Sequence, residues 1–422
     1  MSKLNTNHLS ERPAARSVLR LLAPSALVAC LLAALVPGAS ADPGEENHTR
    51  GSVGGRRLFE RETFGGNGRT CLICHSRETG TVSPADAQER FLANPDDPLF
   101  RADGSDDGSG HGVTRMLNDA TVLMRIPLPG NVSLAGDPTA RSVVVRRGIP
   151  TTLNTPALDP VLMVDGRQPD LIAQARGAIA DHARPTREPT LKELKQIAAF
   201  QKTPGFFSSF PLLKLAYTGI EPKLPQGRTA AEKRGRRFFV DAPPSGDLKT
   251  GLCAACHSGP MLNETNEFIP APPLKRGGRF QSVFVSEFND AANPVIDFVF
   301  KNADGTWTLI SSPDPGRALI TGDANDVFES LNAFKIPSLW GVARTAPYFH
   351  GNSAKSLEDL MRHYARFFAL DLDPSIPPII LTEQDQKDMN RVHEAFAVSS
   401  RSWSRPARAA AAGQTRIYLP VA

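Results

Sequence analysis

Two short copies of one pattern carry the clearest chemistry in this 422-residue sequence. In each copy, two cysteines separated by two residues are followed directly by a histidine. The copies are Cys71, Cys74, His75 and Cys253, Cys256, His257. This C-x-x-C-H spacing is typical of c-type haem attachment, in which the thiols bond to the porphyrin vinyl groups and the histidine is the proximal iron ligand. The sequence therefore predicts two covalently bound haem c groups.

A redox pair or a zinc site is the alternative use of a C-x-x-C pair. Chance is a weak explanation, because two patterns with an adjacent histidine must arise from only five cysteines and nine histidines. If haem uses both pairs, no cysteine of the mature chain is left for a disulfide.

The first 41 residues have the features of a secretory signal peptide. A positively charged stretch precedes an apolar run at 21–36, and residues 39–41, Ala-Ser-Ala, supply a small-residue cleavage pattern. We expect cleavage after Ala41 and a periplasmic or secreted mature protein. Lipid attachment at Cys30 is the less favoured alternative. No other stretch is apolar enough to span a bilayer, so we expect no stable membrane insertion.

The overall composition excludes other classes of protein. A hydrophobic fraction of 41% and a charged fraction of 22% exclude a disordered chain. The net charge of +4 is spread along the chain, so nothing indicates a nucleic-acid partner. The 33 glycines and 36 prolines indicate long loops.

The chain is internally duplicated around the two motifs. Gly-Arg-Arg-Leu-Phe begins at Gly55 and Gly-Arg-Arg-Phe-Phe begins at Gly235, and each resembles the first helix of a cytochrome c domain. Capping boxes at Thr190 and Thr382 predict a helix near the end of each repeat, the first through Gln201 and the second through residue 397.

We predict a mostly α fold, because no sustained alternation of apolar and polar residues indicates strands. Two cytochrome c-like haem domains with long loops are expected at 42–204 and 227–400. The segment 205–226 is the predicted linker, and 401–422 is a predicted extended tail.

Two stretches of the second repeat form a signature with a known counterpart. They are Lys-Ile-Pro-Ser-Leu at 335–339 and Thr-Ala-Pro-Tyr-Phe-His-Gly at 345–351. Both resemble the bacterial di-haem cytochrome c peroxidases and MauG-type enzymes. The first repeat agrees through Asp-Gly-Arg at 165–167 and Gln-Ala-Arg-Gly at 174–177. The resemblance covers about 51–399.

The resemblance implies different work for the two haems. The N-terminal haem, with His75 as proximal ligand, would be peroxidatic, and the C-terminal haem, with His257, would stay six-coordinate and pass or store oxidising equivalents. Asp165, Arg167 and Gln174 match the family's segment on the distal side of the N-terminal haem. Gln174 matches an amide that would hydrogen-bond to bound hydrogen peroxide.

Tyr364 stands at the position of the second haem's sixth ligand. The family's peroxidases carry Met fourteen residues after the signature histidine, here His350, and MauG-type enzymes carry Tyr. A phenolate stabilises Fe(III) and higher states, whereas Met favours Fe(II). The alternative is a core aromatic residue on an amphipathic helix. Met361 and His363 are neighbours that face other sides of the helix.

The sequence does not decide which residues act on the distal side of the first haem. The family's acid ten residues after Gln174 falls here at an arginine. The candidates for moving a proton during O–O cleavage are Arg184, Asp181, His182 and Glu188. The distal ligand of this iron is His111, His182 or none. His111 lies in an Asp/Gly/Ser-rich insertion, which favours a solvated loop histidine.

Three departures from the family pattern affect the expectations. Val164 replaces the Trp between the haems. Gly148 replaces the Asn that binds an inter-haem calcium ion, which leaves the backbone carbonyls of Thr345 and Pro347, so one bound calcium ion is an open alternative. Gly251 replaces the surface Trp with which MauG oxidises its own protein substrate, so that substrate is not supported.

We therefore expect a periplasmic di-haem c-type peroxidase of the MauG-like type. Hydrogen peroxide would be activated at the N-terminal haem, and oxidising equivalents would be shared with the C-terminal haem. The electron donor would be a small redox protein, a cytochrome or a cupredoxin. One alternative is a MauG-like oxidase that modifies side chains of a partner protein, and another is a non-enzymatic di-haem electron-transfer cytochrome.

Overall fold

The computed structural model describes residues 53–153, 158–203, 220, 222–243, 246–268, 274–372 and 377–396. The predicted signal peptide, the tail and most of the linker lie outside these residues. All the described residues belong to one compact unit, Gly44–Ala422. No helix in the described ranges is long and apolar enough to cross a membrane.

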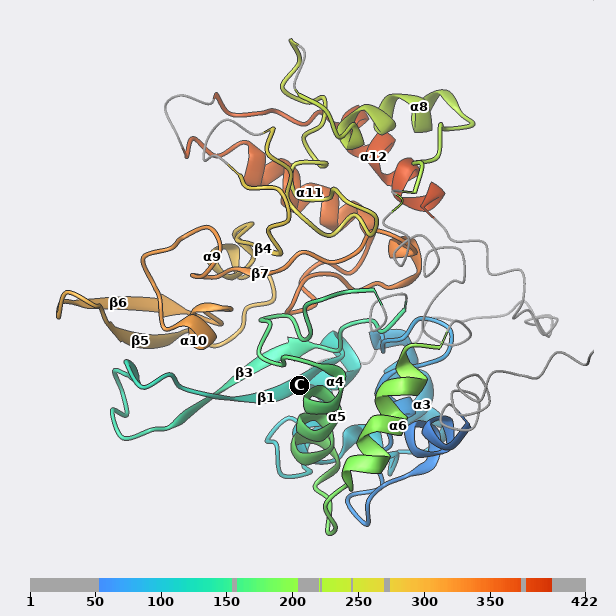
Figure 1. Ribbon diagram of the computed structural model, residues 1–422, viewed down its shortest axis with the longest axis vertical. Helices are drawn as coiled ribbons and strands as arrows, with labels where there is room; N and C mark the ends of the chain where they lie inside the picture. The colour runs from blue at the N-terminus through green and yellow to red at the C-terminus, as the bar shows by residue number, and fades with distance from the viewer. Residues whose placement is uncertain are drawn as a thin grey trace, which may run out of the picture. The chain divides into compact units, whose positions relative to one another are not determined.

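The first repeat combines short helices with a pair of longer strands (Figure 1). Residues 53–61 form its first helix. The elements that follow are α2 (Cys71–Cys74), α3 (Pro84–Ala93), η1 (Pro98–Phe100), η2 (Ala102–Gly104), α4 (Thr114–Asp119), β1 (Thr121–Pro127), β2 (Val132–Leu134), β3 (Ser142–Gly148), α5 (Leu171–Ala178), η3 (Ile179–Ala183) and α6 (Leu191–Gln201).

The second repeat has the same general order, with helices at its start and end. Its elements are α8 (Ala230–Arg236), η4 (Arg237–Phe239), β4 (Phe280–Gln281), α9 (Val285–Phe288), β5 (Ile296–Lys301), β6 (Trp307–Ser312), α10 (Ala318–Thr321), β7 (Phe334–Lys335), η5 (Val342–Arg344), α11 (Leu357–Phe368) and α12 (Glu383–Ala395).

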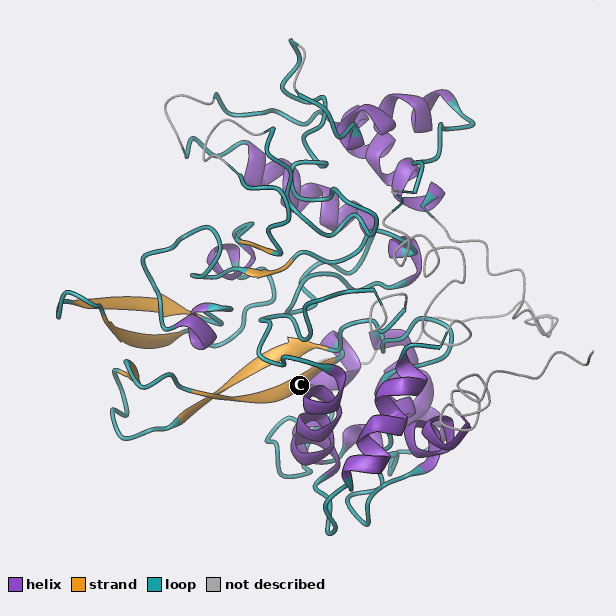
Figure 2. Ribbon diagram, in the orientation of Figure 1, coloured by secondary structure: helices purple, strands orange, loops and turns teal. Residues whose placement is uncertain are grey.

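The strands form small antiparallel sheets, and one sheet is shared by the two repeats (Figure 2). β1 pairs with β3 from Thr121 opposite Gly148 to Pro127 opposite Ser142. β2 of the first repeat pairs with β5, which pairs in turn with β6. β4 and β7 form a two-residue pair. The shared sheet ties the two repeats together by backbone hydrogen bonds.

The expectation of a mostly helical fold is therefore met only loosely. Strand β5 does show strand-like alternation, which we did not expect. Phe298 and Phe300 are buried, and the residues between and beside them are more exposed. In β3 buried and exposed residues also alternate, but apolar and polar residues do not. The exposed residue Val144 is apolar, and the buried residue Arg147 is charged.

Each repeat packs its first helix against its last helix through a glycine. A Cβ added to Gly55 would lie 2.0 Å from the carbonyl oxygen of Gln196 in α6, and one added to Gly235 would lie 2.2 Å from that of Asp388 in α12. Real side chains do not approach so closely, so only glycine lets these backbones touch. The two glycines of the sequence repeat thus have the same structural role.

The predicted capping boxes are confirmed. The Thr190 side chain accepts from the backbone N–H of Glu193 at the start of α6, and the Glu193 carboxylate accepts from the backbone N–H of Thr190. Thr382 and Asp385 do the same at the start of α12, which ends at residue 395 rather than 397. Each box satisfies backbone donors that a helix start leaves unpaired.

The first attachment motif lies between two hydrophobic clusters, and the second lies against a third. Cys71 packs against a cluster built from Leu58, Phe59 and α6, and Cys74 packs against a larger one. That larger cluster also contains Phe298 and Phe300 of the second repeat, whose side chains are 0% exposed. The core of the first repeat is thus completed by the second.

Candidate haem sites

Each predicted iron-binding histidine is held by the same hydrogen bond. The Nδ1 atom of His75 lies 2.8 Å from the carbonyl oxygen of Gly80, and the Nδ1 atom of His257 lies 2.8 Å from that of Leu262. A carbonyl oxygen only accepts, so Nδ1 donates in both pairs. Nε2 then carries the free lone pair, as an iron-ligating imidazole requires.

The loops that supply these carbonyls share one backbone shape although their sequences differ. In each motif the acceptor lies five residues after the histidine and has a left-handed backbone, with φ of 69° at Gly80 and 53° at Leu262. Glycine adopts this conformation freely, whereas leucine does so at a cost on the order of 1–3 kcal/mol. Burial of the Leu262 side chain in the core of the second repeat offsets that cost.

The four cysteines of the motifs are free thiols in the described chain. Burial raises the pKa of Cys71 and of Cys256 to about 12, and it raises those of the other two thiols as well. Burial also lowers the pKa of His75 and of His257 to about 4.

A large cavity opens beside the first motif. Its empty space, including the part open to solvent, is about 1380 Å³, which leaves room for a bulky prosthetic group. Cys71, Cys74 and His75 contribute to its wall, as do Arg167 and Gln174. The structure thus brings together the first attachment motif and two of the three residues predicted for its distal side.

Asp165, the third of these residues, lies behind the cavity wall. Its carboxylate is fully buried and accepts hydrogen bonds from Arg147 and Arg167, with Arg167 Nη1 at 2.9 Å. Burial would raise the pKa of Asp165, but the positive charges of the two arginines hold it below its usual range. Asp165 therefore positions Arg167, which itself faces the cavity.

Arg147 makes a second ion pair, which crosses from the first repeat to the second. Its Nε lies 2.7 Å from Asp314 Oδ2, and its Nη2 lies 3.0 Å from Asp314 Oδ1. Both side chains are only 2% exposed. With Asp165 as its other partner, the guanidinium has two carboxylates that offset the cost of removing its charge from water.

The helix that carries Gln174 continues into a wider turn that carries His182. α5 is followed directly by η3, a π-helical turn, and such turns occur often at functional sites. His182 lines the same cavity as Gln174 and His75. Of the four candidates for proton transfer, His182 is therefore the one that the fold brings to the cavity.

The other candidates lie at the surface. Asp181, Arg184 and Glu188 are exposed. The side chain of His111 is 87% exposed, and its Nδ1 lies 2.9 Å from Asp107 Oδ2 in the same loop. His111 is thus a solvated loop histidine, as its sequence context favoured.

Tyr364 lies beside the second attachment motif, on α11. Tyr364 and Cys253 pack against the same hydrophobic cluster. Burial raises the pKa of Tyr364, and negative charge on Cys256 or Cys253 would raise it further, so the phenol lies near both thiols. The role of Tyr364 as the sixth ligand stays a prediction.

The neighbours of Tyr364 on α11 have other contacts. The Nε2 atom of His363 lies 2.7 Å from the carbonyl oxygen of Val283, and the ring packs 4.4 Å from that of Phe349 between centroids. Met361 is 2% exposed and belongs to the core cluster of the second repeat. These contacts account for His363 and Met361 as structural residues.

The space beside Gly148 is filled by a side chain of the second repeat. A Cβ added to Gly148 would lie 2.1 Å from Asn352 Oδ1. Asn352 Nδ2 donates to the carbonyl oxygens of Asp119 at 2.9 Å and Ala120 at 3.1 Å. Within the described ranges, no three His, Cys, Asp or Glu side chains are grouped to hold a metal ion. Calcium binding stays a prediction.

Val164, which replaces the family's Trp, connects the first cavity to the second repeat. Its side chain lines the cavity, and its carbonyl oxygen accepts the N–H of Lys335 in β7 at 2.7 Å. Lys335 Nζ also donates to Asp159 Oδ2 at 2.7 Å, and both residues line the cavity. Strand β7 of the second repeat therefore reaches the wall of the first cavity.

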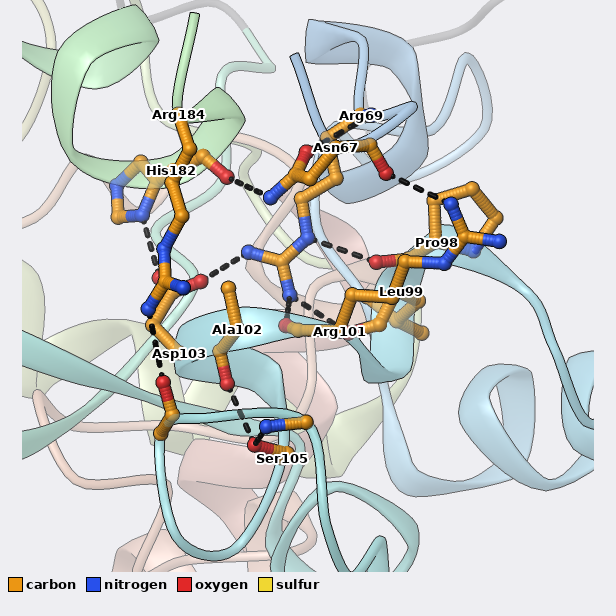
Figure 3. A network of polar contacts seen from close by, with 12 residues as sticks. Asn67, Arg69, Pro98, Leu99, Arg101, Ala102, Asp103, Ser105, His182 and Arg184 are labelled. Carbon is orange, nitrogen blue, oxygen red and sulfur yellow. Dashed lines mark hydrogen bonds and ion pairs between the residues drawn. The ribbon is translucent and has the colours of Figure 1, made fainter.

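Two polar residues of the first site were missed in the sequence. Arg69 lines the cavity and is 2% exposed, and Asp103 binds both Arg69 and His182 (Figure 3). For Arg69 the sequence offered one signal, which is a difference between the repeats: the second repeat has Gly251 at the matching position, two residues before its first cysteine. Asp103 offered none, since it stands among many aspartates in a Gly/Ser-rich segment.

A curated relative supports the family resemblance. The chain is 26% identical to the cytochrome c551 peroxidase of Pseudomonas aeruginosa over 236 residues, which are 50% of this chain and 56% of that protein. This partial similarity agrees with the resemblance to bacterial cytochrome c peroxidases that the motifs indicated. It matches only a little more than half of this relative's length. No model of a known protein family matches the chain.

Two solved structures show a limited similarity to this chain. A MauG-like protein associated with microbial copper homeostasis is 19% identical, with a TM-score of 0.46, 86% of this chain covered and 91% of that chain. The di-haem peroxidase BthA of Burkholderia thailandensis is 15% identical, with a TM-score of 0.44, 85% of this chain covered and 87% of that chain.

Proposed function

We propose that the chain is a periplasmic di-haem c-type peroxidase of the MauG-like type. In this proposal, hydrogen peroxide reacts at the haem held by the first motif, with His75 as the proximal ligand. His257 and Tyr364 would hold the iron of a second haem, which would store part of the oxidising equivalents.

The observation that carries the proposal is the difference between the two sites. Both motifs hold their histidine in the same orientation, which supports two haems bound in the same way. At the first motif, two polar side chains, Gln174 and Arg167, line a large cavity together with the histidine. The second motif has a buried tyrosine nearby and a hydrophobic core around it. This arrangement favours one reactive haem and one saturated haem.

A haem bound at the first motif would supply an iron site for peroxide and the electrons that reduce it. The polar residues of the chain bind and orient the peroxide. The Gln174 amide donates a hydrogen bond to it, and the Arg167 guanidinium stabilises the negative charge that develops on the departing oxygen. Asp165 holds Arg167 in place by a buried ion pair, so the cation needs no rearrangement during the reaction.

The partners follow from the same proposal. Reduction of peroxide needs an external electron donor, for which we propose a small cytochrome or cupredoxin. Export by the predicted signal peptide would place the protein in the periplasm. A protein substrate oxidised by the stored equivalents is the alternative source of electrons.

Electron paramagnetic resonance of the holoprotein, matured with its haems, tests the proposal. We expect one high-spin ferric haem and one low-spin ferric haem, together with turnover of hydrogen peroxide when reduced small cytochromes are supplied. Two low-spin haems without peroxide turnover would instead establish an electron-transfer cytochrome. Peroxide-driven oxidation of a partner protein without turnover of cytochromes would favour the oxidase.

A further inference from the structure

A histidine–carboxylate pair lies in the first cavity. His182 Nδ1 lies 2.6 Å from Asp103 Oδ2, and Asp103 Oδ1 is bound by the guanidinium of Arg69 (Figure 3). His182, Arg69 and His75 all line the cavity. None of the residues that match the family pattern on the distal side belongs to this pair.

Asp103 is held as a carboxylate. Burial alone would raise its pKa, but the hydrogen bond from His182 and the charge of Arg69 together hold it below its usual range. A carboxylate only accepts, so His182 Nδ1 is the donor. Nε2 of the neutral ring is then an acceptor, free to take a proton from a ligand in the cavity.

The surroundings fix the pair in place. Asn67 Nδ2 donates to the backbone carbonyl oxygen of His182 at 2.9 Å. Arg69 donates from Nε to the carbonyl oxygen of Pro98 at 2.8 Å and from Nη2 to that of Leu99 at 2.9 Å. The backbone of His182 and the side chain of Arg69 are therefore both held by hydrogen bonds on either side of the Asp103 carboxylate.

The wide turn η3 explains why this histidine shares a face with Gln174. His182 lies eight positions after Gln174, which in a regular α-helix would place it about 80° around the helix axis. A π-helical turn accommodates one extra residue, which returns His182 towards the face of Gln174. An amide donor and an imidazole acceptor thus enter one cavity from one helix.

We propose that His182 is the catalytic proton carrier of the first site and that Asp103 is its positioning residue. This inference rests on the peroxidase function proposed above. His182 Nε2 takes a proton from one oxygen of hydrogen peroxide and returns it to the other oxygen as the O–O bond breaks. Overall, peroxide takes up two electrons, supplied through the haems, and two protons to give two water molecules. His182 relocates a proton and is regenerated.

The first experiment compares the wild-type holoprotein with His182→Gln. General acid–base catalysis contributes about 10²–10⁴-fold, so the second-order rate of reaction with hydrogen peroxide should fall by that factor in the variant. The visible and resonance spectra of both haems should stay unchanged. A rate within about threefold of the wild type would overturn the proposal. So would a change of the first haem from low spin to high spin, because His182 would then be an iron ligand.

A second measurement does not depend on turnover. Hydrogen cyanide loses a proton when it binds ferric haem as cyanide, so its binding rate also depends on a base in the cavity. His182→Gln should slow cyanide binding. If the wild-type holoprotein did not react with peroxide, the proposed function would fail, while cyanide binding would still test the role of His182. Equal cyanide rates in both proteins would contradict it.

The loop pair Asp107–His111 is a matched control. It has the same contact between Nδ1 and a carboxylate oxygen, at 2.9 Å, but it lies at the surface. His111→Gln should change neither rate. Asp103→Asn should lower the peroxide rate less than His182→Gln does, and the double variant should lose nothing beyond His182→Gln. Additive losses would show that Asp103 acts independently of His182.

Discussion

The two attachment motifs hold their histidines in the same way but have different surroundings. His75 and His257 each donate from Nδ1 to a carbonyl five residues ahead, from loops of the same backbone shape. His75 lines a cavity together with Gln174 and His182, whereas Tyr364 and a hydrophobic core lie beside the second motif. In the proposed function, the duplicated features would hold the haems, and the features that differ would decide what each iron can do.

Removing the two histidines in turn should give the largest contrast. His75→Ala should abolish the reaction with hydrogen peroxide and leave the absorption and resonance spectra of the second haem intact. His257→Ala should remove the low-spin signal of the second haem. Visible and resonance spectroscopy of both purified variants measure this. Equal effects on peroxide reactivity and on both spectra would contradict the inequivalence of the sites.

Tyr364→Met should change the second site alone. Axial ligation sets haem potentials over a range of about 0.8 V, so we expect a rise on the order of 0.1 V or more in the potential of the second haem. A spectroelectrochemical titration measures it. Tyr348→Phe is the control, because this tyrosine lies in the same core and its hydroxyl donates to the carbonyl oxygen of Val342 at 3.0 Å. An unchanged potential in Tyr364→Met would show that another side chain binds the iron.

Arg147→Leu should weaken the connection between the repeats. It leaves the buried carboxylates of Asp165 and Asp314 without their shared partner, which should lower the free energy of unfolding by about 3–5 kcal/mol at pH 7. Denaturant titration of the holoprotein measures this.

The pH dependence of that loss has a definite sign. The low pKa of Asp165 in the folded chain stabilises it above the usual aspartate range, and this contribution is lost as pH falls through the folded pKa. The penalty of Arg147→Leu relative to the wild type should therefore shrink below about pH 4, where unpaired carboxylates take up protons. A penalty that grew in acid would contradict this assignment.

Gly55→Ala and Gly235→Ala should have the smallest effects, and similar ones. Each adds a methyl group where a backbone carbonyl lies 2.0 or 2.2 Å away, which should cost about 1–3 kcal/mol of stability. Gly136→Ala is the control, because nothing lies within 4 Å of its added Cβ. Thermal unfolding compares the three. A large difference between the first two would show that the helix contacts of the repeats are not equivalent.

The sequence predicted what depends on local patterns. The repeated glycines and the capping boxes at Thr190 and Thr382 each depend on a few neighbouring residues, and the structure places them as expected. The haem motifs are equally local, and haem attachment stays a prediction. The sequence did not show that the loops after His257 and His75 have the same backbone shape, because Leu262 adopts the left-handed conformation that usually requires glycine.

What the sequence could not give depends on contacts between distant segments. Asp103 reaches His182 across 79 positions, and the π-helical turn that directs His182 to the cavity has no local signature. The pairing of β2 with β5 joins residues more than 160 positions apart. Such contacts are set by how the whole core packs, and no window of neighbouring residues reports them.

The shared sheet limits how far either repeat can be treated as a module. A second repeat expressed alone would expose the unpaired edge of β5 together with Phe298 and Phe300. Such an edge can pair with another chain and lead to aggregation. A domain-swap chimera that exchanged one repeat for a homologous cytochrome would need to carry both sides of this seam.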